Sequence, residues 1–177
     1  MDVGAGDGGY VLHRARTDPD TYAIAIDASP DGLASGAWRA KRARVANVAF
    51  LVAAVERLPR ELAWVADEVT VHFPWGSLLR GLVDGSGSVI GPIASLMKGG
   101  AELRVLMSAV DRDGFAELDP SVANSWCGAY SEHGLRLIDA DWASNAVVAA
   151  SGSAWAKRLG VGRARRAVIA RYRRDAT

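Results

Sequence analysis

The sequence predicts an α/β protein with a seven-stranded, mostly parallel sheet, helices on both faces and an antiparallel last strand. Apolar runs of strand length alternate with helix-length segments from residue 21 to residue 142, which is the pattern of βαβ units. Glycines crowd residues 4–9, where such a fold needs a tight turn from a first strand into a helix. The last apolar run, 164–174, follows its predecessor without a full crossover helix, so we expect it to lie antiparallel.

Four of the expected strands lie in the first half of the chain. Residues 1–3 form the first, which is short for the centre of a sheet, so we expect an N-terminally shortened version of the fold. The other strands are expected at 21–27, 47–52 and 68–73, and the helices at 8–16 and 31–43, with a short helix or turn at 61–67. Pro30 favours the start of the second helix, because its fixed φ suits the first turn.

The second half continues the alternation with three further helices and three further strands. The helices are expected at 78–83, 89–98 and 121–133, and the strands at 101–108, 135–142 and 164–174. Gly99-Gly100 and Gly134 follow helices in the manner of C-terminal caps. Residues 151–162 are expected to form a loop with one helical turn. The alternation within 164–174 predicts an exposed strand at the edge of the sheet.

The composition is that of one globular domain spanning residues 1–177. Half of the residues are hydrophobic and 23% are charged. No uncharged apolar run reaches membrane-spanning length, and no signal peptide precedes the glycine-rich turn, so we expect a cytoplasmic protein without membrane contact. One cysteine, Cys127, excludes an internal disulfide, and three scattered histidines do not predict a metal site. A monomer is the default expectation.

The net charge of +1 hides an uneven distribution. Residues 1–156 contain 13 Lys and Arg against 19 Asp and Glu, whereas residues 157–177 contain 8 against 1. A second basic cluster follows the second expected strand at Arg39, Lys41, Arg42 and Arg44. Arginine outnumbers lysine 18 to 3, and arginine favours bidentate phosphate contacts. Two such clusters indicate an anionic partner such as nucleic acid, and a solvated charged face remains the alternative.

The glycine-rich turn has the spacing of a nucleotide-type site. Asp2, Gly4, Gly6 and Gly8 alternate, and Asp27 ends the next strand 19 residues after Gly8, where a carboxylate would lie beside a ribose. No lysine or serine follows the glycines to clamp a triphosphate. The acids Asp2 and Asp7 suit a cationic ligand better than a pyrophosphate. A tight strand–helix turn with no ligand is the alternative.

Two further strand ends should meet the glycine turn, because ligands in such sheets bind at the carboxyl edge. Val55-Glu56 follows the third strand, and Glu56 either contacts a base edge or is a surface residue. The fourth strand ends in His72-Phe73-Pro74-Trp75-Gly76-Ser77. We expect the Trp75 ring to be exposed as a stacking surface, with core packing as the alternative.

A third feature combines an aromatic ring with cations in a loop of small residues. It runs from Ser151 to Arg166 and contains Ser153, Trp155, Lys157, Arg158, Arg163 and Arg165. An aromatic side chain interleaved with arginines is a base-and-phosphate contact pattern. Alternatively, Trp155 anchors the loop to the core while the arginines are solvated.

The glycine turn resembles the first motif of class I S-adenosylmethionine (SAM) methyltransferases. Together with the F-P-W-G and S-x-W-x-K-R stretches, it resembles the aminoglycoside-resistance 16S rRNA methyltransferases of the kanamycin–apramycin type. The resemblance implies methylation of N1 of adenine 1408 in the decoding site of the 30S subunit. It places the flipped adenine between Trp75 and Trp155. It implies SAM contacts at Asp2, Gly4, Gly6, Gly8, Asp27, Val55, Glu56, His72 and Ser77, and rRNA contacts at Pro74, Ser153, Lys157, Arg158, Arg163 and Arg165.

Two alternative functions remain open from the sequence. The chain could be a SAM-dependent methyltransferase that acts on another RNA or on a small molecule. Enzymes that methylate small molecules in this fold usually cover the site with a lid, and no insertion here is long enough for one. It could also be an inactive Rossmann-like module that only binds RNA, which a titration with SAM would distinguish from both enzymes.

Overall fold

The computed structural model describes residues 1–177 except 109–117, 154–155, 158–159, 161–164 and 177. Seven strands form one sheet: β1 (Asp2–Val3), β2 (Ala23–Asp27), β3 (Val48–Val52), β4 (Ala66–His72), β5 (Met97–Met107), β6 (Leu135–Trp142) and β7 (Val168–Arg174). The helices are α1 (Gly9–Thr17), α2 (Pro30–Arg42), α3 (Gly76–Val83), α4 (Gly87–Leu96), α5 (Val122–Ser125), α6 (Cys127–Ser131) and α7 (Asn145–Ala150). Two short 3₁₀ turns, Val55–Arg57 and Arg60–Leu62, join β3 to β4.

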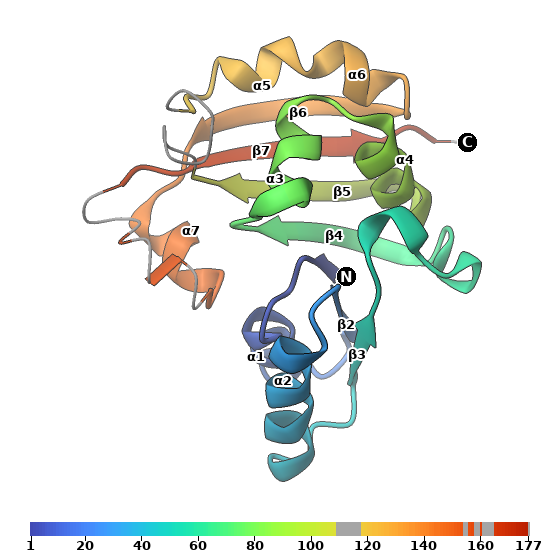
Figure 1. Ribbon diagram of the computed structural model, residues 1–177, viewed down its shortest axis with the longest axis vertical. Helices are drawn as coiled ribbons and strands as arrows, with labels where there is room; N and C mark the ends of the chain where they lie inside the picture. Colours follow the sequence, from blue (N-terminus) through green and yellow to red (C-terminus); the bar gives the residue numbers. More distant parts are fainter. Residues whose placement is uncertain (109–117, 154–155, 158–159, 161–164, 177) are drawn as a thin grey trace.

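The strand order is β3-β2-β1-β4-β5-β7-β6 (Figure 1). Strands β1 to β5 pair in parallel, and β7 is antiparallel to both β5 and β6. The predicted fold class is therefore confirmed. The first strand has only two residues, and it lies in the centre of the sheet between β2 and β4. The order changes direction at β1 and β4, where open α/β sheets bind their ligands.

The prediction that the last strand is an exposed edge strand is wrong. Strand β7 lies between β5 and β6, and its alternate residues Val168, Ala170 and Tyr172 are buried. Arg171 and Arg173 face the other side of the sheet. The alternation of apolar and charged residues therefore reflects the two faces of the sheet, not a position at its edge. Arg171 forms a bidentate ion pair with Asp139, and this hydrogen bonding lowers the pKa of the Asp139 carboxyl.

Several element boundaries also differ from the expected ones. Helix α4 ends at Leu96, and Gly99-Gly100 lies within β5, because Met97 already pairs with Ala66. The helix expected at 121–133 is divided at Trp126 into α5 and α6. Helix α7 was not expected; the Ser144 side chain caps it by accepting a hydrogen bond from the Val147 N–H.

Helices cover the two faces of the sheet unequally. On one face, α3, α4 and α6 bury the main core, in which Ile90, Ile93 and Tyr130 pack against β4, β5 and β7. On the other face, α1 and α2 cover β2 and β3 through a smaller cluster that includes Val11 and Leu33. This arrangement places the start of α1 and the start of α2 beside the carboxyl ends of β1 and β2 (Figure 1).

Paired charges occupy the second face of the sheet over β4, β5, β7 and β6. Arg104 lies 2.7 Å from Glu102 and 3.6 Å from Glu68, and Arg173 lies 3.7 Å from Glu102. Arg171 also pairs with Asp139, so at least these two arginines of the basic segment 157–177 are engaged within the fold. The basic C-terminal segment is consequently a weaker anion-binding surface than its sequence suggests. None of the helices in the described ranges is long and apolar enough to cross a membrane.

Candidate functional site

Glycines shape the loop that joins β1 to α1. Gly4, Gly6 and Gly8 all have positive φ values, of 72°, 57° and 67°, which other residues rarely adopt. A Cβ atom on Gly4 would lie 2.6 Å from the Leu78 side chain, and one on Gly8 would lie 2.5 Å from Phe50. The loop backbone is therefore held against two neighbouring elements, as the alternating glycines predict.

The carboxylate of Asp27 is fixed at the end of β2, above the loop. Its Oδ2 accepts a hydrogen bond from the Gly6 N–H at 2.7 Å, and its Oδ1 accepts one from the Ser29 N–H at 2.8 Å. Each oxygen keeps a further lone pair for a ligand hydroxyl. The half-buried side chain lines the crevice that opens at the carboxyl edge of the sheet.

A buried polar pair lies deeper in the crevice at Asp2. The Asp2 Oδ1 accepts a hydrogen bond from the Thr70 hydroxyl at 2.7 Å and lies 3.1 Å from His72 Nδ1. The distance permits an ion pair when His72 is protonated. The contact does not have hydrogen-bond geometry, and His72 Nδ1 has no hydrogen-bond partner among the described residues. The His72 ring meets Tyr10 edge to face, with centroids 4.4 Å apart.

Replacing Thr70 with valine is expected to destabilise the protein by about 1–3 kcal/mol, because a buried carboxylate loses its hydrogen-bond donor. Urea unfolding measures this difference. The matched control is Thr21→Val, which removes a hydroxyl 2.6 Å from the solvated carboxylate of Asp18. That control should change the unfolding midpoint very little. If the two variants lose the same free energy of unfolding, the Asp2–Thr70 hydrogen bond contributes no more to stability than the exposed one.

Two adjoining cavities form one elongated crevice along the carboxyl edge. The larger, about 360 Å³, lies over Asp2, the glycine loop and His72, and the smaller, about 240 Å³, lies over Val55 and Glu56. Gly4, Asp27 and Trp75 line both. Neither cavity has a lysine or arginine among its lining residues within the described ranges, so the crevice suits a cationic ligand without phosphate.

Trp75 stands at the mouth of this crevice with 70% of its surface exposed, as predicted. The turn before it is unusual, because Phe73 has a positive φ of 50° and precedes a proline. Phe73 is held there by its N–H, which donates to the Leu106 carbonyl at 2.7 Å, and by a buried side chain that packs with Leu106 and Ala156. Pro74 is buried and lines the smaller cavity.

The three residues that follow α7 form the opposite wall. Ser151, Gly152 and Ser153 line the larger cavity, and the Ser153 hydroxyl accepts a hydrogen bond from the Ala156 N–H at 3.2 Å. Lys157 is exposed, whereas Arg165 is half-buried. Trp155, Arg158 and Arg163, which the sequence singled out, lie outside the described residues. Arg166, not singled out, is exposed and lies 3.5 Å over the Trp142 ring.

The structure brings together nearly all of the residues predicted to hold the cofactor. Those that line one or both cavities are Asp2, Gly4, Gly6, Asp27, Val55, Glu56, His72 and Ser77. Gly8 lies beneath the loop, against Phe50. Tyr10 and Ser151 also line the larger cavity and were not predicted as site residues. Tyr10 directly follows the glycine-rich turn and Ser151 begins the stretch that contains Ser153, so their position in the sequence could have indicated them. Asp7 is paired with Arg39 at 2.9 Å, so its charge is not free for a cationic ligand, contrary to expectation.

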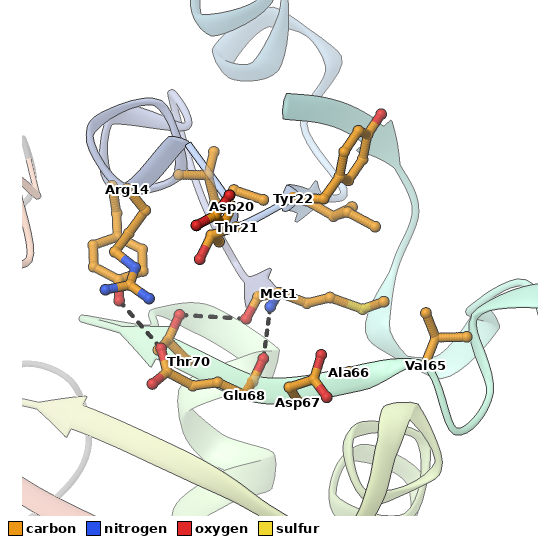
Figure 2. Close-up of a pocket in the computed structure, with 14 residues that line it drawn as sticks. Met1, Arg14, Asp20, Thr21, Tyr22, Val65, Ala66, Asp67, Glu68 and Thr70 are labelled. Carbon is orange, nitrogen blue, oxygen red and sulfur yellow. Dashed lines mark hydrogen bonds between the residues drawn. The ribbon is translucent and has the colours of Figure 1, made fainter. Parts of the chain in front are cut away.

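A further cavity of about 410 Å³ lies at the other end of the central strands (Figure 2). Its lining comes from α1, the beginning of β2 and the first half of β4, including Arg14, Tyr22 and Glu68. Tyr10 is a wall shared with the larger cofactor cavity. Burial, together with the charge of Glu68, raises the pKa of Tyr10 to about 12, so this phenol is neutral at working pH. No group of three or more metal-ligating side chains occurs in the described part of the chain.

Solved structures superpose on nearly the whole chain. A variant of the 16S rRNA (adenine(1408)-N(1))-methyltransferase from Catenulisporales acidiphilia gives a TM-score of 0.85 at 28% identity, covering 99% of this chain and 87% of that one. A tryptophan-to-alanine variant of that enzyme with cosubstrate SAM gives 0.85 at 25% identity, covering 98% and 84%. The 16S rRNA methyltransferase KamB gives 0.83 at 29% identity, covering 98% and 86%.

The sheet order, the crevice and these superpositions define a Rossmann-like class I methyltransferase. Residues 1–173 match the model of the family described as NpmA, 16S rRNA (adenine(1408)-N(1))-methyltransferase, and the chain belongs to that family. A relative of that name from Escherichia coli is 29% identical over 93% of this chain and 82% of its own length. Another, from Streptoalloteichus tenebrarius, is 31% identical over 96% of this chain and 84% of its own length.

Proposed function

We propose that this protein transfers a methyl group from SAM to N1 of adenine 1408 in 16S rRNA of the 30S subunit, and so confers aminoglycoside resistance. The observation that carries the proposal is the exposed Trp75 ring at the mouth of a crevice lined by carboxylates and no described cation. We further propose that residues 1–177 act as one domain, as a monomer in the cytoplasm.

The lining of the crevice supports a place for each part of SAM. Asp27, shared by the two cavities, would accept hydrogen bonds from the ribose hydroxyls, and the backbone at Val55-Glu56 would flank the adenine. Asp2 and His72 line the other end, where the buried Asp2 carboxylate favours the amino group of the methionine moiety. SAM, when bound, supplies an electrophilic methyl group on a sulfonium.

The residues present suit attack by adenine N1, which has a free lone pair at neutral pH and needs no general base. The lone pair forms the new N–CH₃ bond as the S–CH₃ bond breaks, which leaves a neutral thioether and a cationic adenine. Orientation then provides most of the catalysis. Trp75 and Trp155 would hold the flipped base, and indole faces tolerate the positive charge of the product.

The exposed basic residues beside the crevice would contact the rRNA backbone. Reversing two of them, Lys157→Glu with Arg166→Glu, is expected to weaken 30S binding about 10-fold or more and to flatten its salt dependence. Filter binding over a series of salt concentrations measures both. The control reverses two exposed arginines that line neither of the two cofactor cavities, Arg16 and Arg60. If both double variants bind alike, rRNA docks on another surface.

Primer extension tests the proposed function directly. The protein is expressed in a susceptible bacterium, and reverse transcription of the small-subunit rRNA should stop at adenine 1408, since methylated N1 cannot pair. Expression of the Trp75→Ala variant is the control for host modification. A stop elsewhere, or labelled methyl transfer to other RNA only, would refute the proposed substrate. Failure to bind SAM would leave only an RNA-binding module.

A further inference from the structure

One side of α2 lies directly against the glycine loop. Gly32, Gly36 and Arg39 are spaced by four and three residues, so they share that side of the helix. A Cβ atom on Gly32 would lie 2.8 Å from the carbonyl oxygen of Gly6, and one on Gly36 would lie 2.3 Å from the carbonyl oxygen of Asp7. Both separations are too short for a carbon–oxygen contact, so only glycine permits this approach.

Arg39 completes the contact one turn farther along the helix. Its Nη2 donates hydrogen bonds to the carbonyl oxygen of Asp7 at 2.6 Å and to Asp7 Oδ2 at 2.9 Å. Asp7 Oδ1 in turn accepts a hydrogen bond from the Gly9 N–H at 3.1 Å. From the other side, Asp27 holds the Gly6 N–H at 2.7 Å. Residues 6 and 7 are therefore held between two elements.

The neighbouring cations of α2 do not share this role. The Arg42 guanidinium lies 5.3 Å from the centroid of the exposed Trp38 ring, and Lys41 and Arg42 are exposed. Arg39 is only half-exposed and faces the loop. The basic cluster of the sequence thus contains one residue that serves the glycine loop and others that remain available at the surface.

We propose that Gly32, Gly36 and Arg39 form a seat that holds the glycine loop in its cofactor-binding conformation, with Arg39 as a positioning residue for SAM and not an RNA contact. This inference rests on the proposed function for the identity of the cofactor. Gly6 and Asp7 line the larger cavity, so their displacement would change the wall that faces the ligand. A loop that is already ordered loses less conformational entropy when the ligand binds, so Arg39 contributes to affinity without touching SAM.

The test compares Arg39→Met with Arg42→Met, which removes the same charge from the same helix. Calorimetry with SAM should show affinity reduced about 10-fold in Arg39→Met and unchanged in Arg42→Met. Hydrogen exchange of residues 4–10 in the cofactor-free protein should accelerate only in Arg39→Met. Arg39→Lys keeps the charge and a donor group but loses the planar guanidinium, so it should recover part of the affinity.

Each outcome decides the inference. If Arg39→Met binds SAM as tightly as the wild type and its residues 4–10 exchange at the wild-type rate, the inference is overturned and the proposed function stands. A lower melting temperature of this variant would not change that conclusion. If Arg39→Met does not fold, Asp7→Asn breaks the same pair and should weaken SAM binding in the same direction; unchanged affinity there would also overturn it. If the double variant Arg39→Met with Asp7→Asn folds, its loss of SAM affinity should be smaller than the sum of the two single losses, because both substitutions break the same pair. If the wild-type protein bound no SAM, the proposed function and the inference would fail together.

Discussion

Replacing Trp75 with alanine is expected to reduce the rate of methyl transfer to 30S subunits about 100-fold, because a flipped base without its stacking surface is misaligned with the methyl donor. The Trp75 ring is 70% exposed, so its removal should cost little stability. Affinity for SAM should change by less than about threefold, since Asp27, the proposed partner of the ribose, is untouched. Single-turnover methylation with labelled SAM measures the rate.

The conservative control is Trp75→Phe, which keeps an aromatic face and should retain a substantial part of the rate. A second control is Trp38→Ala, which removes another exposed tryptophan, 59% accessible, from the surface of α2. That variant should transfer methyl groups at the wild-type rate in the single-turnover assay with saturating 30S. Normal turnover by Trp75→Ala would contradict the proposed stacking of the target base.

Replacing Asp27 with alanine is expected to weaken SAM binding by about 10- to 100-fold, because the proposed hydrogen bonds from the ribose hydroxyls would have a charged acceptor. The loss has a second cause in this fold. The same carboxylate orders the loop through the Gly6 N–H and the start of α2 through the Ser29 N–H. Isothermal calorimetry with SAM, alongside thermal unfolding, separates affinity from stability.

Asp27→Asn keeps the shape of the side chain but loses its charge and one acceptor, so its affinity should lie between those of the wild type and Asp27→Ala. Asp31→Ala is the matched control, because Asp31 is an exposed acid in the first turn of α2 and lines neither of the two cofactor cavities. An Asp27→Ala protein that binds SAM as tightly as the Asp31→Ala protein would remove Asp27 from the site.

The parallel part of the fold could be predicted from local sequence because its signals are local. Apolar runs such as Val48–Val52 and the alternating glycines of the first loop identify strands and the turn without reference to the rest of the chain. The position of β7 could not be predicted in this way. Its alternation suits either an edge strand or an antiparallel strand between neighbours. The ion pairs of Arg171 with Asp139 on β6 and of Arg173 with Glu102 on β5 join residues that are far apart in the sequence.

The candidate site likewise has a part that could be predicted from the sequence and a part that could not. The strand ends at Asp27, Val55 and His72 converge because parallel strands share one carboxyl edge, a consequence of topology that the sequence order already contains. The pairing of Asp7 with Arg39 spans 32 residues and depends on how closely α2 approaches the loop. No local pattern specifies that approach, so both residues were assigned other roles from the sequence.

The position of Tyr10 has a consequence for water inside the protein. Its side chain lines both the larger cofactor cavity and the 410 Å³ cavity behind it, and its phenol lies 3.5 Å from Glu68. Truncation to alanine would join the two spaces into a channel beside the buried Asp2. Solvent admitted from the far side would then screen that carboxylate and weaken its hold on a cation. In the proposed enzyme, this one aromatic ring would therefore limit the access of solvent to the Asp2 end of the crevice from behind.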